Sequence, residues 1–576
     1  MTTSKPPVAG GTAVYICHCG HNIAATVDVP ALADALGEKP GVSMVRHYPY
    51  LCSRPGQELI RKDLRDGVAG RVVVAACSPR MHEATFRKAV EAEGLNPYLF
   101  THVNVREQCS WVHSDMGAAT SKAADLIGAG LARVRLQKAL EGGKSEVTRA
   151  LLVVGGGVSG LAAALLAAQM GIPVTLVEVL GHLGGHAREF GRSFPSGEPV
   201  RPWLEGIIST LTGSPHAEVL LESGVARVEG APGAFEVSFD TPSGTKRGLF
   251  GAIIVATGFS PYDPASSPGG RPELGYGEDP AIVTQAGFEK FLNFPVEPDP
   301  NALAGRNVAF LQCVGSRDRT TGGGHCSRAC CMVSVRQADM ALKQGAASAT
   351  VLYTDLRAYA RGAEEAYERA ARGGVLFCRG AASEIYKNGA ERIVRFEDTL
   401  LGRAGELAAD IVVLACGARP RPDATPTGRL FSLANGADGF YLEAHPKLKP
   451  TETPQECVYL AGACQGPKTI DEAVSSGRAA AVKAAARLLR GWLPVDPVVA
   501  RIDAERCVSC GLCAANCPTG AIFERRAGLP RFVNTSLCRG CGACASACPS
   551  HAASLAHNLD VQILAELDCL VGIAPL

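Results

Sequence analysis

Two runs of cysteine near the end of the chain have the spacing of iron ligands. Each run reads C-x2-C-x2-C-x3-C and is followed by proline, the bacterial pattern in which the fourth cysteine of each run ligates the other of two 4Fe–4S clusters. Zinc is the alternative metal, but its sites take four ligands and rarely repeat an eight-cysteine run. We expect the first cluster on Cys507, Cys510, Cys513 and Cys548, and the second on Cys538, Cys541, Cys544 and Cys517.

A third group of cysteines lies in the middle of the chain and has irregular spacing. Cys330 and Cys331 are adjacent, so both cannot belong to a ferredoxin loop. On spacing alone, a metal site, a redox dithiol and buried core thiols are all open. The group consists of Cys313, Cys326, Cys330 and Cys331.

The cysteines of the first 110 residues follow no metal-ligand spacing. Histidines such as His18, His82 and His102 accompany them, so a metal site is one alternative. Buried or reactive thiols are the favoured interpretation. These cysteines are Cys17, Cys19, Cys52, Cys77 and Cys109.

A glycine-rich turn follows the apolar run Leu151 to Val154 and precedes a helical pattern that continues to Met170. In a dinucleotide fingerprint the first glycine makes the tight turn, the second lets the backbone approach a pyrophosphate, and the third packs helix on strand. The pyrophosphate lies at the helix N-terminus. These roles fall to Gly155, Gly157 and Gly160.

An acidic residue ends the next predicted strand, which completes a βαβ unit. Glu178 follows Val174 to Val177, and a carboxylate there accepts hydrogen bonds from an adenosine ribose and rejects a 2′-phosphate. A glycine-rich turn without a ligand is the alternative. Strand, helix and acid together make this fingerprint far more specific than a lone glycine pattern.

Further glycine segments favour FAD over NAD, because they are typical of two-lobed flavoproteins. The helix expected after Ala461-Gly462-Ala463 begins near Thr469 to Glu472, and its N-terminus would stabilise an anionic reduced flavin. Taken alone, Ala461-Gly462-Ala463 could equally be an ordinary turn. The expected flavin contacts in these segments are Gly184, Gly185, Thr257, Gly258, Gly462 and Ala463.

The second lobe lacks the glycine pattern of a nicotinamide site. After the expected strand Val308 to Leu311, the segment Gln312 to Arg317 retains one glycine of the fingerprint, Gly315. We therefore expect no NAD(P)H binding there, which argues against a simple pyridine-nucleotide reductase.

Five segments carry these motifs. Near the N-terminus, helical patterns alternate with expected strands at Ala13 to Cys17, Ser43 to Tyr48 and Arg71 to Cys77. Residues 1–10 are expected to be disordered, and residues 141–149 are expected to form a polar linker. The segments are 1–145, an N-terminal α/β module; 146–306, the first part of an FAD domain; 307–410, an inserted second lobe; 411–495, the second part of the FAD domain; and 496–576, a ferredoxin domain.

Composition excludes several other classes of protein. The 576 residues carry a net charge of +1, which gives no electrostatic reason to expect nucleic acid or an anionic membrane as partner. No stretch is long enough to span a bilayer, and no secretory signal is recognisable. In the reducing cytoplasm that we therefore expect, the 22 cysteines cannot form a disulfide framework.

Seven short segments carry a more specific signal: Cys17-His18-Cys19-Gly20, Ala76 to Glu83, Cys109 to His113, Gln312 to Asp318, Cys326 to Cys331, His445 to Leu448 and Gln465 to Lys468. They resemble, nearly word for word, stretches of the heterodisulfide reductase A-subunit family, the flavin-containing iron–sulfur component of that enzyme. The similarity runs from about residue 13 to the end.

The resemblance implies a thioredoxin-reductase-like FAD domain whose second lobe carries a third 4Fe–4S cluster on Cys313, Cys326, Cys330 and Cys331. It also implies other heterodisulfide reductase-type subunits, hydrogenase or formate dehydrogenase modules and ferredoxin as partners, and a homodimer within the complex. In members that bifurcate, FAD splits an electron pair between a high-potential and a low-potential path.

Two departures from the family bear on bifurcation. Longer members insert a further ferredoxin module after the segment matching Phe190 to Pro195, whereas Ser196 to Ile207 continues here without cysteine. A lysine that those members place by the flavin corresponds to Arg336, whose guanidinium keeps the charge but does not readily release a proton. Both differences argue against full bifurcation, not against electron transfer through FAD.

The sequence thus predicts an α/β, thioredoxin-reductase-like two-lobed FAD flavoprotein with an N-terminal α/β module and a C-terminal two-cluster ferredoxin domain. Its expected function is electron transfer between a donor, FAD, iron–sulfur clusters and an acceptor. A flavoprotein subunit of a quinone-interacting complex, a non-catalytic scaffold and an NADPH–ferredoxin-type reductase are the alternatives. The N-terminal module and the eight-cysteine tail favour the heterodisulfide reductase type.

Overall fold

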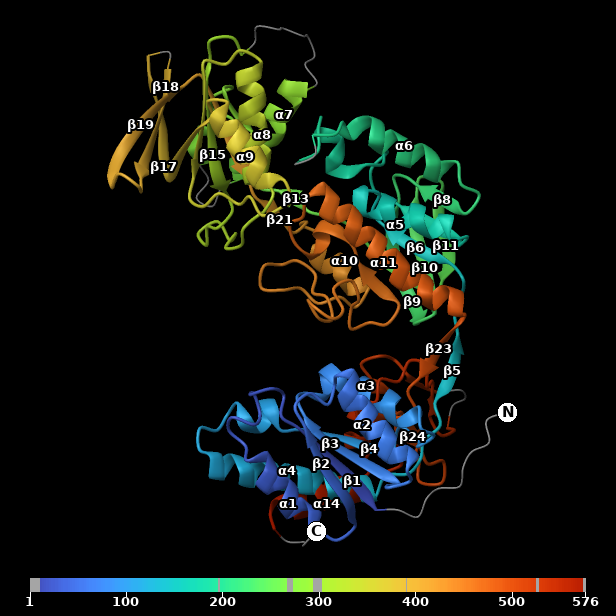
Figure 1. Cartoon of the computed structure of the whole chain (residues 1–576). Helices are drawn as coiled ribbons and strands as arrows, with labels where there is room; N and C mark the ends of the chain where they lie inside the picture. The colour runs from blue at the N-terminus through green and yellow to red at the C-terminus, as the bar shows by residue number, and fades with distance from the viewer. Residues whose placement is uncertain are drawn as a thin grey trace. The chain divides into compact units, whose positions relative to one another are not determined.

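The structure is a computed structural model that describes residues 11–194, 197–266, 273–293, 303–389, 391–524 and 528–572. The chain divides into two compact units (Figure 1). One combines Met1–Lys144 with Pro494–Leu576, and the other is Ser145–Leu493. Residues 1–10, where we expect disorder, lie outside the described residues.

The N-terminal module is a four-stranded sheet with helices packed against it. Its elements are β1 (Thr12–Cys17), α1 (Val29–Gly37), β2 (Val42–Tyr48), α2 (Arg54–Arg65), β3 (Arg71–Ala76), α3 (Pro79–Glu91), β4 (Phe100–Asn104) and α4 (Met116–Arg135). The strand order is β2-β1-β3-β4 and every pairing is parallel. The central strands β1 and β3 are almost wholly buried, which is why they read as continuous apolar runs. The three strands expected here are confirmed, each to within one residue.

The ferredoxin segment belongs to the same unit as the N-terminal module. Its elements are β24 (Ala500–Ile502), α12 (Leu512–Ala515), β25 (Ile522–Phe523), β26 (Phe532–Val533), α13 (Ala543–Ser546), β27 (Ala553–Leu555) and α14 (Asp560–Leu570). β24 pairs with β27 and β25 with β26, both antiparallel. The final helix α14 packs against α4 (Figure 1).

Arg133 near the end of α4 joins the two parts of this unit. Its guanidinium forms an ion pair with Glu566 at 2.7 Å and donates to the carbonyl oxygen of His557 and to Oδ1 of Asn558, each at 2.7 Å. The side chain is 23% exposed. One half-buried cation therefore binds three groups of the C-terminal segment. Because the donor is charged, these hydrogen bonds are stronger than those between neutral groups.

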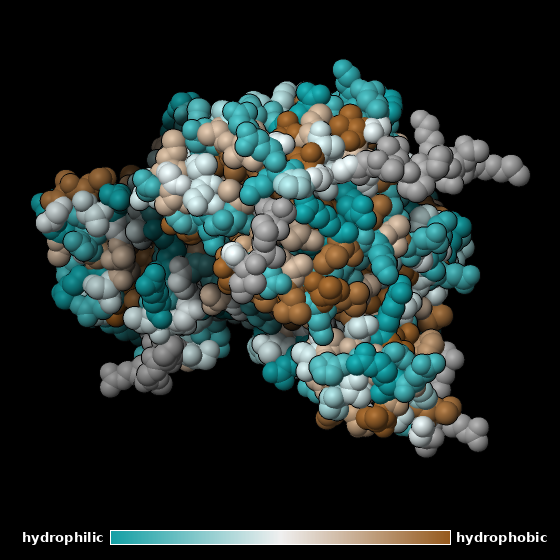
Figure 2. Space-filling model, turned by 90° about the horizontal axis from the view of Figure 1, so that it is seen from below, coloured by the Kyte–Doolittle hydropathy of each residue, from teal (hydrophilic) through white to brown (hydrophobic). Residues whose placement is uncertain are grey.

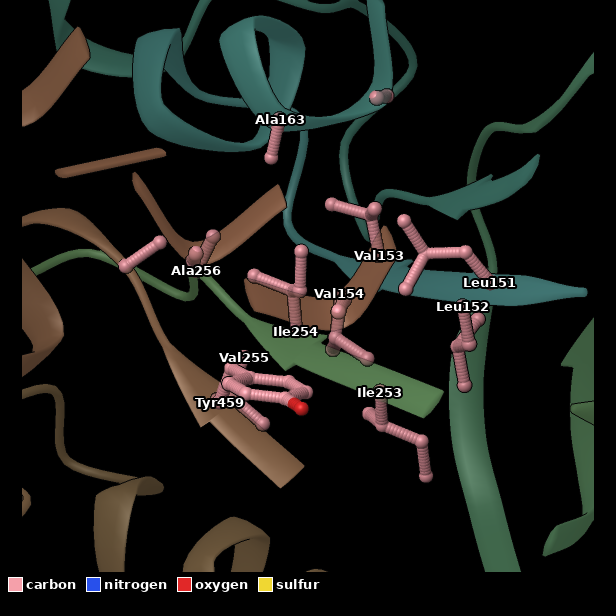
Figure 3. Packing of buried hydrophobic residues seen from close by; sticks show 14 of the residues in the cluster. Leu151, Leu152, Val153, Val154, Ala163, Ile253, Ile254, Val255, Ala256 and Tyr459 are labelled. Carbon is pink, nitrogen blue, oxygen red and sulfur yellow. The ribbon is translucent and has the colours of Figure 1, made fainter. Parts of the chain in front are cut away.

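The first lobe of the other unit is a five-stranded parallel sheet in the order β22-β12-β6-β7-β8. Its elements are β6 (Leu151–Val154), α5 (Val158–Gln169), β7 (Val174–Val177), α6 (Val200–Thr212), β8 (Ala217–Leu220), β12 (Ala252–Val255), α10 (Ala424–Leu430), β22 (Val458–Leu460) and α11 (Ile470–Arg490). Side chains of β6 and β12 pack in one cluster with Ala163 of α5 and Tyr459 of the neighbouring strand β22 (Figure 3). The predicted βαβ unit is confirmed as β6, α5 and β7.

A three-stranded antiparallel sheet is added to this lobe, in the order β11-β10-β9. Phe235, Val237 and Phe239 of its central strand join the same hydrophobic core. Its strands are β9 (Gly224–Ala231), β10 (Ala234–Thr241) and β11 (Gly244–Phe250).

The second lobe is built on a seven-stranded sheet in the order β14-β20-β15-β16-β17-β18-β19. Its elements are β14 (Ile282–Thr284), α7 (Gln285–Asn293), β15 (Asn307–Val314), α8 (Cys330–Lys343), β16 (Ser348–Tyr353), α9 (Ala363–Arg372), β17 (Leu376–Asn388), β18 (Glu391–Asp398), β19 (Arg403–Ala409) and β20 (Ile411–Cys416). The boundaries expected at residues 307 and 410 are therefore wrong at both ends. β14 and β20 pair inside this sheet, because an apolar parallel strand carries no sequence mark of the sheet it joins.

The expected linker 141–149 is also partly structured. Gly143–Glu146 forms strand β5, which pairs with β23 (Trp492–Val495) in a two-stranded sheet. A partner far away in the sequence thus stabilises a segment that local polarity predicted to be coil.

No helix in the described part of the chain is long and apolar enough to cross a membrane. Hydrophobic residues do reach the surface, some of them grouped (Figure 2). On α14, for example, Val561, Leu564 and Leu567 are exposed while the helix packs on α4.

We predict that Arg133→Met loosens the C-terminal segment, because it removes an ion pair and two hydrogen bonds at once. Loss of charge-assisted bonds of this kind costs about 2 kcal/mol. Hydrogen exchange of the α14 amides should become faster. Arg135→Met is the matched control, since Arg135 donates to the Pro40 carbonyl within the N-terminal module. Equal exchange of α14 in both variants would show that Arg133 does not hold the segment.

Candidate functional site

A cavity of about 390 Å³ opens where the strands β6 and β12 end and the helices α5 and α11 begin. This is the position at which open parallel sheets bind ligands. The second lobe contributes to the wall through Ala329, Val333 and Arg336. Of the predicted flavin contacts, the following line the cavity: Gly155, Gly157, Glu178, Gly184, Gly185, Thr257, Gly258, Ala463 and Arg336.

Two predicted glycines, Gly160 and Gly462, do not line the cavity. They allow close backbone packing behind its wall. A Cβ on Gly160 would overlap the carbonyl oxygen of Gly155, and one on Gly462 would overlap the Ser159 hydroxyl. A Cβ on Gly157, in contrast, would meet no protein atom within 4 Å. Gly160 thus serves packing of helix on turn, whereas Gly157 leaves free space at the N-terminus of α5.

Glu178 is buried at the end of β7 and is held by two backbone donors. The Gly156 N–H donates to Oε2 at 2.6 Å and the Leu180 N–H donates to Oε1 at 2.9 Å. These bonds fix the carboxylate at the edge of the cavity and link it to the glycine turn. A carboxylate at this position fits an adenosine ribose.

Arg336 reaches the cavity from α8 and is paired with a buried acid that the sequence reasoning missed. Its partner Glu289 on α7 has no exposed side-chain surface. Glu289 also accepts from Gln337 Nε2 at 2.8 Å and from the Gly191 N–H at 3.0 Å. The Nε of Arg336 is buried and has no hydrogen-bond partner among the described residues, so what Arg336 contributes to the cavity wall is a positive charge held in place by Glu289. A cation in the wall fits a cofactor that carries negative charge.

A histidine and an acid, also missed, lie in the same wall. His186 Nδ1 and Glu189 Oε1 are 3.0 Å apart, and His186 Nε2 lies 3.1 Å from the Phe259 carbonyl oxygen. The hydrogen bond to Glu189 raises the pKa of His186. The signal for this pair was its position directly after Gly184-Gly185.

The helix α11 begins with a capping box at the cavity. The Glu472 N–H donates to Thr469 Oγ1 at 3.3 Å, and the Thr469 N–H donates to Glu472 Oε2 at 3.0 Å. Arg328 reinforces this turn: it donates to Glu472 Oε1 at 2.7 Å and to the Pro467 carbonyl oxygen at 3.1 Å. The helix N-terminus expected near Thr469 is confirmed.

The four cysteines of the middle group come together at the start of α8. Cys330 and Cys331 open the helix, and Cys313 has a left-handed backbone with φ of 65° where β15 loses its register. Burial raises the pKa of Cys313 to about 11, and the nearby Cys331 and Cys326 thiols add to the rise. The hydrogen bond from Cys330, together with Arg357 and Arg317, lowers the pKa of Cys331.

The ferredoxin segment places its cysteines in two similar surroundings. The fourth cysteines, Cys517 and Cys548, each accept a backbone N–H, from Ala521 at 3.2 Å and Ala553 at 3.4 Å. Burial opposes ionisation at both, but these and neighbouring hydrogen bonds lower the pKa of each thiol. A small cavity is lined by the four cysteines expected for the first cluster, Cys507, Cys510, Cys513 and Cys548.

The four cysteines expected for the second cluster also lie near one another. Cys538 and Cys541 lie close enough to Cys544 that their charges raise its pKa, after burial as the main cause. Cys517 and Cys538 pack against the same small core as Cys544. In the described part of the chain, no three thiol, imidazole or carboxylate groups lie close enough together to bind a single metal ion. A four-iron cluster is larger than an ion and holds its thiolates apart, so sulfurs that surround a space fit it.

The N-terminal module gathers thiols that the sequence left scattered. Cys17 ends β1 and Cys77 follows the adjacent parallel strand β3. The Arg106 guanidinium donates to Cys19 Sγ at 3.1 Å, and the Cys19 N–H donates to Cys17 Sγ at 3.3 Å. Burial raises the pKa of Cys77 to about 12, against the opposing charge of Arg106. The signal for this group was that its cysteines lie at or after strand ends, not their spacing.

Two family models match the chain. Residues 149–477 match the pyridine nucleotide-disulphide oxidoreductase family, and residues 500–549 match the 4Fe–4S dicluster domain. These matches confirm the predicted α/β flavoprotein fold with a C-terminal ferredoxin domain, and they support FAD and 4Fe–4S clusters as cofactors. They also confirm an oxidoreductase.

Curated relatives match almost the whole chain. An iron–sulfur A-subunit of the CoB–CoM heterodisulfide reductase of Methanopyrus kandleri is 37% identical over 88% of this chain and 90% of its own length. The A-subunit of the H(2):CoB-CoM heterodisulfide,ferredoxin reductase of Methanothermobacter marburgensis is 35% identical over 90% of this chain and 91% of its own.

A solved thioredoxin reductase of T. acidophilum aligns with 58% of this chain and 97% of its own at 16% identity, with a TM-score of 0.40. The conclusion rests on the sequence matches. Their identity and coverage confirm the resemblance stated above, and the chain belongs to the A-subunit family of heterodisulfide reductase.

Proposed function

We propose that this protein is the flavin- and iron–sulfur-containing component of a heterodisulfide reductase-type complex. It passes electrons between a donor module, FAD, 4Fe–4S clusters and either ferredoxin or a disulfide-reducing subunit. The family assignment supports an electron-transfer flavoprotein of this kind.

One observation carries the proposal. Ala329 lines the flavin cavity and lies between Cys326 and Cys330 in the chain. The four-thiol group at the start of α8 therefore lies directly behind the wall that Ala329 and Val333 form, where a two-lobed reductase would otherwise hold a nicotinamide. Electrons leaving a cluster there would have a short path to the flavin.

The proposed cofactor residues follow from their surroundings. The N-terminus of α5 and the free space at Gly157 receive the pyrophosphate, Glu178 accepts from the ribose, and Arg336 contributes a positive charge to the wall beside the flavin. Bound flavin supplies the exchange between two-electron and one-electron transfer. The thiolates hold three clusters: Cys313, Cys326, Cys330 and Cys331; Cys507, Cys510, Cys513 and Cys548; and Cys538, Cys541, Cys544 and Cys517.

Partners follow from the family. The name of the Methanothermobacter marburgensis relative mentions H2 and ferredoxin. We propose hydrogenase or formate dehydrogenase modules as donors. The proposed acceptors are ferredoxin and a disulfide-reducing subunit, and a homodimer is the proposed core of the complex.

Iron and flavin quantitation of the anaerobically purified protein tests the cofactor content. Three cubanes predict about twelve iron atoms per FAD. Paramagnetic resonance of the dithionite-reduced protein should show interacting clusters. About eight iron atoms would remove the middle cluster, and about sixteen would require the N-terminal thiols to bind iron as well.

The variant Cys331→Ser tests the middle cluster separately. Loss of one thiolate ligand should lower the iron content by about four atoms while FAD stays bound. Cys378→Ser is the control, because Cys378 is a half-buried thiol on β17 outside all three cysteine groups. Equal iron in both variants would contradict the assignment of Cys331.

A pair of glycine substitutions tests the flavin site. Gly157→Ala meets no protein atom, so the thermal midpoint should stay unchanged, yet the methyl group occupies the space proposed for the pyrophosphate and should weaken FAD binding about tenfold or more. Gly160→Ala should lower both the midpoint and FAD binding, since its methyl group overlaps Gly155. Undiminished FAD affinity in Gly157→Ala would place the pyrophosphate elsewhere.

A further inference from the structure

We propose that Lys468 is the counter-charge for the reduced flavin ring and sets its reduction potential. This inference rests on the proposed function, because it assumes that FAD occupies the cavity described above. It deepens that function by naming a residue that favours electron storage on the flavin.

Lys468 lines the cavity immediately before the first turn of α11. It lines the wall together with Ala463, Thr469 and Ile470, and it directly precedes the N-cap Thr469. α11 is 21 residues long, so its N-terminus carries the partial positive charge of a full-length helix. The lysine adds a whole charge at the same end.

The ammonium of Lys468 has no partner within the described part of the chain, where it makes no hydrogen bond, ion pair or ring contact. Burial lowers its pKa, and the charges of Cys464, Glu472 and Glu443 only partly oppose this. A cation in the cavity wall that has no paired anion among the described residues can pair with a negative charge on a ligand.

Glu472, whose charge acts on Lys468, already accepts hydrogen bonds from other groups. Oε1 of Glu472 accepts from Arg328 at 2.7 Å, and Oε2 accepts from the Thr469 N–H at 3.0 Å and from the Tyr359 hydroxyl at 3.3 Å. Arg328 therefore holds the carboxylate that could otherwise neutralise Lys468. It also fixes the loop through the Pro467 carbonyl oxygen at 3.1 Å.

Two anionic parts of FAD could meet this charge. The pyrophosphate is accounted for by the glycine turn and the N-terminus of α5. The ring system is neutral when oxidised. Uptake of two electrons from the clusters and one proton leaves it with one negative charge, and return of both electrons and the proton restores the neutral form. A cation that faces the ring favours the reduced form over the oxidised one.

The test is a spectroelectrochemical titration of the flavin in the full-length, cluster-loaded protein. Lys468→Met should lower the ratio of reduced to oxidised flavin at a given potential about tenfold, a shift of about 30 mV to more negative values for a two-electron couple. FAD affinity, measured by equilibrium dialysis, should stay unchanged. Lys468→Arg should restore the wild-type potential.

Lys483→Met is the matched control. Lys483 lies on the same helix, is 54% exposed and pairs with Glu452 at 3.1 Å, outside the cavity. Its loss should leave the potential unchanged. An unchanged potential in Lys468→Met, or a loss of FAD in that variant, would overturn the assignment, the latter because Lys468 would then hold a phosphate. If wild-type protein binds no FAD, the proposed function itself fails, and the two failures are distinguishable.

Discussion

The close approach of α5 to its own preceding turn and to α11 is the contact on which the flavin lobe depends. Gly160 lets the helix pack against the Gly155 carbonyl, and Gly477 of α11 has room for no Cβ beside the Ser159 carbonyl. Because neither glycine carries a side chain, the two helices can pack closely, and both begin at the same cavity. Each contributes the partial positive charge of its N-terminus to the cavity wall. That charge is a consequence of how tightly the backbone packs.

The same packing explains what the sequence could and could not predict. The βαβ unit was predictable since Leu151 to Val154, Gly155, Gly157, Gly160 and Glu178 act locally, each within one turn or strand. The role of Glu289 was not predictable, because the sequence does not distinguish a buried glutamate from one on the surface. Its burial depends on Arg336 and Gln337, which bind it in the folded structure. Strands β14 and β20 were misassigned for a related reason: an apolar strand does not encode its neighbours.

The thiols show the same contrast between local and non-local information. The eight-cysteine tail was predictable because its ligands come from short repeated loops. The middle group depends on tertiary structure: Cys313 leaves β15 in a left-handed conformation and meets residues at the start of α8. The N-terminal thiols are further apart in sequence and meet only because β1 and β3 are parallel neighbours. Spacing rules detect the first kind of cysteine group and miss the other two.

The ion pair between Arg133 and Glu566 joins residues 433 positions apart. A ribosome adds about 5–20 residues per second, so the face of α4 waits roughly 20–90 s after its own synthesis before α14 exists to cover it. During that interval the first module must stay folded and out of contact with other nascent chains. The contact between α4 and α14 therefore forms late in synthesis, and a premature stop near residue 500 would leave the face of α4 that α14 covers exposed.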